Sequence, residues 1–219
     1  MTIKFIKLYI LVLINVISVC AHSQELKDLF IASDKKITWL GIDFSHAKFI
    51  GEFAEMYGVG TNNGAQIRDK FFPEWNFFIV KEPRKYDIKG MLRKDFIIID
   101  MNMINKLNSE IKPEDIASNN SPDFKKEDIQ NFVNNYPIDK NNSGIGTLFI
   151  VEYFNKNIKE ASIYFAVINI QTKDVLFQEK IISKPAGTGV RNYWGGAIFD
   201  AIEKIKNDRY YIWKKQFGK

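Results

Sequence analysis

The alternation of apolar and polar residues is most regular in the C-terminal third of the chain. Gly146 to Phe154, Ala161 to Ile170 and Val175 to Ser183 are rich in β-branched and aromatic residues, and we predict a strand for each. A polar four-residue turn, Gln171 to Asp174, joins the second and third strands. Such a turn is too short for a parallel crossover, so these two strands are predicted to pair antiparallel in a β-meander.

Two long helices are predicted where apolar residues recur every three or four positions. The first runs from Ala65 to about Glu82, with a kink or restart at Pro73 because proline lacks a backbone N–H. Its apolar stripe is Ile67, Phe71, Trp75, Phe78 and Ile79. The second runs from about Tyr193 to Lys206 and carries the stripe Trp194, Ile198, Ala201, Ile202 and Ile205. Asp208 to Phe217 follows as a second short helix or an aromatic tail.

The N-terminal half is predicted in less detail. Lys36 to Phe44 has the pattern of a strand, whereas Ser45 to Tyr57 suits a short helix that Gly51 would weaken. Gly58 to Gly64 is a loop in which Asn62 or Asn63 can cap the next helix. Phe96 to Ile99 is four consecutive apolar residues, which predicts an internal strand buried on both faces.

The order of these elements predicts the fold class. Strand and helix alternate first, and three strands and a helix follow, which indicates an α/β fold: a mixed sheet of about five strands with helices packed on it, ending in an antiparallel β-meander and a helix. Between Met101 and Ser143 the chain is rich in Asn, Lys and Asp, and only Lys125 to Asn134 is predicted to be helical there. Residues 24–219 are expected to form a single α/β domain.

The first 23 residues have the pattern of a secretory signal peptide. Lys4 and Lys7 precede an apolar run of about a dozen residues, and Ala21-His22-Ser23 offers small residues to a signal peptidase. The run is shorter than the about 20 residues needed to span a bilayer. Gln24 would then be the mature N-terminus, and the protein would be periplasmic or extracellular. The alternative is a lipoprotein anchored through Cys20, although Val19 stands where a lipobox normally has Gly or Ala.

Composition adds few constraints. Removing Lys4 and Lys7 lowers the formal net charge from +5 to +3, which is no footprint of nucleic-acid binding. Basic pairs such as Lys214-Lys215 are interpreted as solvated surface, with weak attraction to a membrane surface as the alternative. The aromatic residues near the C-terminus either pack over the sheet or form a partner-binding patch, and they are Tyr210, Tyr211, Trp213 and Phe217.

Candidate chemistry is sparse. His46 lies just after a predicted strand, beside Asp43 and Ser45, but neighbouring side chains of an extended chain point apart, so Ser45 and His46 form no dyad. Asp43 and Asp100 both close a β segment and could act as an acid–base pair, although solvated caps are the commoner role. One histidine without cysteine in the mature chain predicts no metal site, and no cofactor is predicted.

The best candidate for a ligand loop is Gly187 to Asn192. Gly187 and Gly189 are flexible, a helix begins there, and Arg191 and Asn192 could bind phosphate or carboxylate. The alternative is a strand-to-helix turn that needs positive φ at glycine, with Arg191 paired to a neighbouring acid. The loop from Gly58 to Gly64 also precedes a helix and is a weaker candidate for anion binding, because it lacks the Lys-Ser/Thr of a P-loop and departs from the G-x-G-x-x-G spacing.

The stretch from Ala161 to Lys206 resembles a segment of bacterial envelope proteins of the TolB amino-terminal and curli-secretion lipoprotein type, and of uncharacterised secreted proteins of Bacteroidetes-like bacteria. The shared pattern is a strand, a turn, a matched strand, a small-residue loop and a helix. Those families usually have glycine in the turn, where this chain has Lys173. The resemblance implies an envelope domain that binds other macromolecules.

Two functions follow as hypotheses. The first is a secreted or periplasmic non-enzymatic domain that acts by protein–protein contact in the cell envelope. The second is a binder of a small anionic ligand, or a hydrolase, that uses Arg191, His46 and the acids Asp43 and Asp100. It requires these four residues to converge within about 10 Å, so that one ligand can touch them all.

Overall fold

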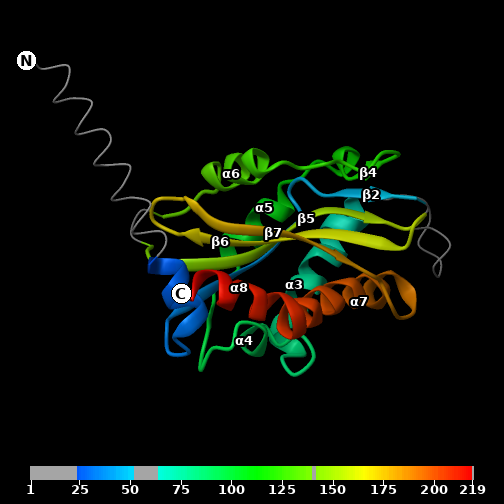
Figure 1. The fold of residues 1–219 in the computed structure, drawn as a ribbon. Helices are drawn as coiled ribbons and strands as arrows, with labels where there is room; N and C mark the ends of the chain where they lie inside the picture. The colour runs from blue at the N-terminus through cyan, green and yellow to red at the C-terminus, as the bar shows by residue number, and fades with distance from the viewer. Residues whose placement is uncertain (1–23, 52–63, 140–141, 219) are drawn as a thin grey trace, which may run out of the picture.

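A seven-stranded mixed sheet lies in the middle of the molecule, with helices on both of its faces (Figure 1). The computed structural model describes residues 24–51, 64–139 and 142–218. This mixed α/β architecture is the one that the order of elements predicts.

Strand β5 (Ile145–Asn155) is the centre of the sheet. Along one of its edges β1 (Ile37–Asp43) and β2 (Lys48–Ile50) follow one another, both parallel to β5. Along its other edge β6 (Glu160–Asn169) pairs antiparallel, and β7 (Val175–Ser183) pairs antiparallel with β6. The predicted pairing of β6 with β7 is therefore confirmed. The sheet is not a simple meander, because β5 also pairs with the parallel strands β1 and β2.

Two short strands complete the sheet outside β1 and β2. They are β3 (Ile98–Ile99), which pairs with β1, and β4 (Ala117–Ser118), which pairs with β2. The prediction of an internal strand at Phe96 to Ile99 is therefore wrong, because β3 is an edge strand of two residues. Phe96, Ile98 and Ile99 are between 42% and 48% exposed.

Beyond the point where β3 ends, two asparagine side chains form hydrogen bonds with the backbone at the edge of β1. Asn76 accepts the N–H of Ile42 (2.7 Å) and donates to its carbonyl oxygen (2.9 Å). Asn108 donates to the same oxygen and accepts the N–H of Phe44, both at 2.8 Å. Gly41 gives Asn76 room, since an added Cβ would lie 2.8 Å from its Oδ1. The side chains take the hydrogen bonds that residues after Asp100 would have made in a longer β3, so the pairing with β1 does not continue past that point.

The larger core lies under one face of the sheet and is rich in aromatic rings. The helical segments on this side are residues 24–31, α2 (Gly64–Gln66), η1 (Ile67–Phe71), α3 (Phe72–Lys81), α4 (Ile88–Met91), α7 (Gly189–Lys204), η3 (Ile205–Arg209) and α8 (Tyr210–Phe217). Every residue of the two predicted apolar stripes is buried, so both long helices are confirmed. The expected break near Pro73 is a π-helical turn, η1, immediately before it.

The smaller core lies under the opposite face, against α5 (Asn102–Ser109) and α6 (Lys126–Asn134). Helix α6 was predicted, whereas α5 was not, because three asparagines lower its helix propensity. A 3₁₀ turn, η2 (Pro113–Asp115), precedes β4. The prediction of a short helix after Ser45 is wrong at Lys48–Ile50, because these residues form strand β2. Residues 52–63, with Asn62 and Asn63, lie outside the described residues.

Candidate functional site

Asp43, one of the predicted strand-end acids, is buried at the end of β1 and has two hydrogen-bond partners. Its Oδ1 accepts the N–H of Ser45 at 2.7 Å, and its Oδ2 accepts the hydroxyl of Tyr136 at 2.5 Å. Burial and the charge of Asp43 raise the pKa of Tyr136 well above its ordinary value. Asp43 therefore has the geometry of a buried cap that joins β1 to the segment after α6.

His46 lies in the break between β1 and β2, and its ring stacks on that of Phe132 with 3.7 Å between centroids. Desolvation by this packing lowers the pKa of His46, although the charge of Asp43 acts in the opposite direction. The ring contact of His46 is therefore with an apolar side chain of α6.

Arg191, in the first turn of α7, is paired with acids of the neighbouring segment. Its guanidinium lies 3.2 Å from Glu74 and 3.7 Å from Glu82, and 4.2 Å from the ring centroid of Phe78. Its Nη1 also donates to the side chain of Asn192 at 3.0 Å. These contacts match the alternative interpretation, in which Arg191 pairs with an acid.

The glycines of the same loop adopt the conformations that a strand-to-helix turn requires. Gly187 has φ +114° and Gly189 has φ +77°, in the region that favours glycine. Lys173, where the envelope families have glycine, also has positive φ, at 63°. Its side chain is held by the carbonyl oxygens of Asn134 and Tyr136.

The four residues of the hydrolase hypothesis are divided between the two faces of the sheet. Asp43 and His46 contact Tyr136 and Phe132, which belong with the smaller core. Arg191 contacts α3, on the side of the larger core. Asp100 caps the end of β3, where it accepts the N–H and the side chain of Asn102. The chain therefore does not assemble them into one site.

Asp100 does line a cavity of about 500 Å³, between the sheet, α5 and the segment after α6. Its floor is apolar, with Leu40 and Ile170 buried, and Met103 and Ile138 are half-buried beside them. Pockets of this size, with an apolar floor and a few polar groups, are typical of ligand sites. The residues that line it are Thr38, Leu40, Ile98, Asp100, Asn102, Met103, Lys106, Pro137, Ile138, Asp139, Asn142, Ser143 and Ile170.

The charged groups of the cavity favour a cation. Two carboxylates, Asp100 and Asp139, line it with one amine, that of Lys106. The Nζ of Lys106 lies 3.9 Å from Glu110, which offsets part of its charge. The carboxylate of Asp100 would therefore attract a cationic group and repel an anionic one.

The outer edge of strand β3 lies next to this cavity. Ile98 lines the cavity and also belongs to β3, whose outer side faces no other strand among the described residues. Phe96 and Ile99 add exposed apolar surface to this edge. An edge strand with exposed apolar side chains is a surface that another chain can pair with. We call Phe96, Ile98 and Ile99 the β3 edge.

Lys106, Asp139 and most of the other cavity residues were missed from the sequence, because 101–143 was predicted to be mainly loop. A signal existed in α5, where Met103, Ile104 and Leu107 have helical spacing. A second was Ile138, an apolar residue in a polar stretch.

A further polar cluster is structural. Glu152 is fully buried and accepts the N–H of Phe124, the hydroxyl of Ser162 and the amine of Lys180. Desolvation acts to lower the pKa of Lys180, but the hydrogen bonds and charges of Glu152 and Tyr164 together outweigh it, so the pKa is raised. The cluster ties the segment before α6 to the sheet.

No protein-family model matches the chain, and no curated protein or solved structure matches it either. Among the described residues, no group of three or more His, Asp or Glu side chains could hold a metal ion. No helix within those same residues is both long and apolar enough to cross a bilayer.

Proposed function

We propose that this chain is an exported, non-enzymatic domain that binds a segment of another cell-envelope protein at the β3 edge. The observation that carries the proposal is the exposure of Phe96, Ile98 and Ile99 on an open sheet edge. Exposed apolar residues on an edge strand are a hazard unless a partner covers them. Export is proposed from the signal pattern of residues 1–23.

The mode of binding is strand addition. An extended segment of the partner would continue the sheet beyond β3, with main-chain hydrogen bonds supplying affinity. Side chains alternate along an added strand, so one of them can enter the cavity beside Ile98. The cavity favours Lys or Arg, whose apolar stem would lie on Leu40 and whose charge would lie near Asp100.

The second hypothesis, an anionic-ligand binder or hydrolase, has weaker support. Arg191 is paired with Glu74 and Glu82, and Asp43 is held by Tyr136 and Ser45. Recruiting either group for a ligand would first require breaking these contacts, at the cost of a buried unpaired charge for Asp43.

A photocrosslinking residue at position 98 of the full chain, expressed in the envelope of the producing cell, tests the proposal. We expect one discrete crosslinked protein at this position, lost when Ile99→Asp is added. The matched control position is Ile158, which is 58% exposed and lies in the turn after β5, whereas β3 pairs with β1, which lies beside the start of β5. The same product from positions 98 and 158, or no product from position 98, would refute the proposal.

A further inference from the structure

The two ends of the described chain meet at one end of the molecule (Figure 1). Helix 24–31 lies against α8: the ring of Phe30 stacks on Phe217 with 5.6 Å between centroids, and the hydroxyl of Tyr210 donates to the carbonyl oxygen of Phe30 at 2.9 Å. The chain therefore passes from the export segment directly into a helix that is packed beside α8.

The inner and outer sides of α8 differ sharply. Tyr210 and Trp213 are buried, so the aromatic tail mainly packs over the core. Tyr211 and Ile212 face outward and are 54% and 48% exposed. Lys214 and Lys215, also exposed, follow them, and α8 contains no acidic residue.

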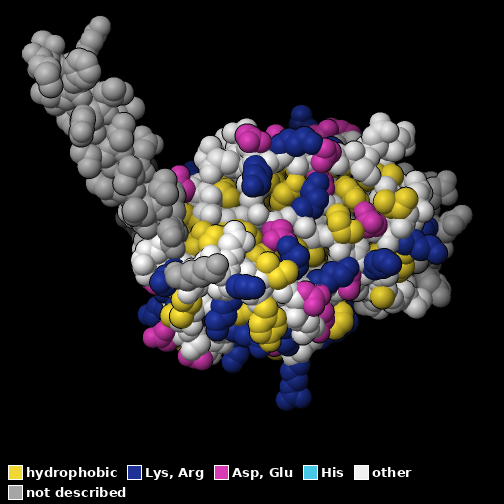
Figure 2. All heavy atoms as spheres, viewed as in Figure 1, with side chains coloured by type: hydrophobic (Ala, Val, Ile, Leu, Met, Phe, Trp, Pro, Cys, Tyr) yellow, Lys and Arg dark blue, Asp and Glu magenta, His cyan; other side chains and the backbone are white. Residues whose placement is uncertain are grey.

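Helix 24–31 extends this surface. Its last residue, Ile31, is 47% exposed, and a Cβ added to Gly218, just after α8, would lie 3.5 Å from its side chain. Arg93 lies over the ring of Tyr211 at 4.9 Å and donates to its hydroxyl. We call Ile31, Tyr211, Ile212, Lys214 and Lys215 the α8 face. Around α8, hydrophobic side chains lie among Lys and Arg side chains in Figure 2.

We propose that the α8 face rests on the surface of a membrane that contains acidic phospholipid. Exposed aromatic and aliphatic side chains with lysines beside them are the composition of helices that lie in the headgroup region. The lysines attract anionic headgroups, while Tyr211 and Ile212 enter the boundary between headgroups and acyl chains.

The position of the face in the chain favours a membrane over a protein as its occupant. If Cys20 carries an acyl anchor, only three residues separate it from Gln24. At about 3.5 Å per residue, this end of the domain would lie within about 14 Å of the anchor. If cleavage follows Ser23 instead, the same face would give reversible contact with the bilayer. The inference does not depend on the β3 edge, whose residues are not on this face.

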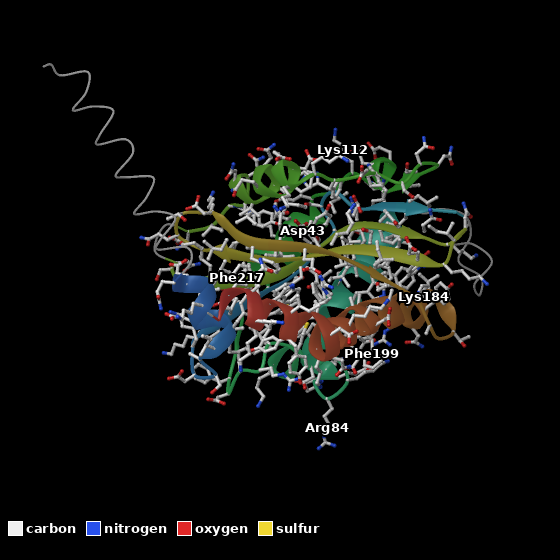
Figure 3. All side chains as sticks on the ribbon, in the orientation of Figure 1. Asp43, Arg84, Lys112, Lys184, Phe199 and Phe217 are labelled. Carbon is white, nitrogen blue, oxygen red and sulfur yellow. The ribbon has the colours of Figure 1, made fainter. Side chains whose placement is uncertain are left out.

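Vesicle sedimentation of the exported full chain carrying Cys20→Ser, which cannot be acylated, tests the inference. We expect binding to vesicles of equal parts phosphatidylcholine and phosphatidylglycerol, weaker binding at high salt, and little to phosphatidylcholine alone. Lys214→Glu/Lys215→Glu and Tyr211→Ser/Ile212→Ser should each weaken binding roughly tenfold or more. The matched control is Lys112→Glu/Lys184→Glu, which changes the net charge by the same amount. Both lysines lie away from Phe217 in Figure 3, so this variant should bind like the parent.

A second measurement does not depend on loss of binding. Cys20 is the only cysteine, so Ile212→Cys in the Cys20→Ser chain carries a unique thiol for an environment-sensitive dye. The dye should shift to the blue on acidic vesicles, and the same dye at Ile158→Cys should not. Equal shifts at both positions, absence of vesicle binding, or equal loss in the Lys112/Lys184 control would overturn the inference.

Discussion

Asn108 is expected to stabilise the fold through its two backbone hydrogen bonds at the unpaired edge of β1. Asn108→Leu keeps the approximate size of the side chain and removes both bonds, each of which contributes about 1 kcal/mol net. The carbonyl oxygen of Ile42 keeps Asn76 as a partner, but the N–H of Phe44 loses its side-chain acceptor. A buried donor without a partner costs about 1–3 kcal/mol, so the free energy of unfolding should fall by about 2–4 kcal/mol.

Urea unfolding followed by circular dichroism measures this loss. The matched control is Asn105→Leu, an exposed asparagine on the same helix, which should change stability by less than about 0.5 kcal/mol. In a thermal melt the Asn108→Leu loss corresponds to a decrease in Tm of about 5–15 °C for a chain of this size. Equal stability of the two leucine variants would refute the role given to Asn108.

Asn108→Asp separates hydrogen bonding from packing by its pH dependence. The new carboxylate can still accept the N–H of Phe44, but its second oxygen would face the carbonyl oxygen of Ile42. Burial and this repulsion favour the protonated form, so the folded-state pKa should lie above the unfolded value of about 3.9. The folded protein then binds more protons, and the variant should regain stability relative to the parent as pH falls from 7 to 4. A difference that does not change with pH would contradict the geometry.

Three further predictions concern the larger core and its helices. Burial lowers the pKa of Lys94 to about 8, so above that pH the unfolded chain binds more protons than the folded chain. The free energy of unfolding should therefore rise with pH from 8 to about 9.5, by at most about 1.4 kcal/mol per pH unit. In urea titrations Lys94→Met should lack this slope. Ile202→Asp places a charge at a fully buried position of α7 and should cost several kcal/mol, whereas a parent-like thermal melt would show that α7 does not dock this way. Gly196→Ala would place a Cβ 2.1 Å from the carbonyl oxygen of Ala186, so it should lower Tm, while the exposed Asn207→Ala should not.

Local patterns in the sequence were sufficient for the elements whose burial follows from their own periodicity. The stripe of α7 is an example: Trp194, Ile198 and Ile202 lie on one side of any helix that contains them, so the buried face follows from the spacing alone. The antiparallel pairing of β6 with β7 is another, because a short turn leaves the second strand no other direction.

The tertiary structure decided which strands, side chains and cavities lie next to each element. Four apolar residues at Phe96 to Ile99 would suit an internal strand, yet among the described strands β3 pairs with β1 alone, and Asn76 and Asn108 bond the edge of β1 beyond its end. The candidate site follows the same rule. Asp43, Arg191 and Asp100 have suitable chemistry in the sequence, but the sheet separates the first two, and the third lines the cavity beside β3. Periodicity is a property of neighbouring residues, whereas an open edge, an ion pair or a cavity depends on segments that only folding brings together.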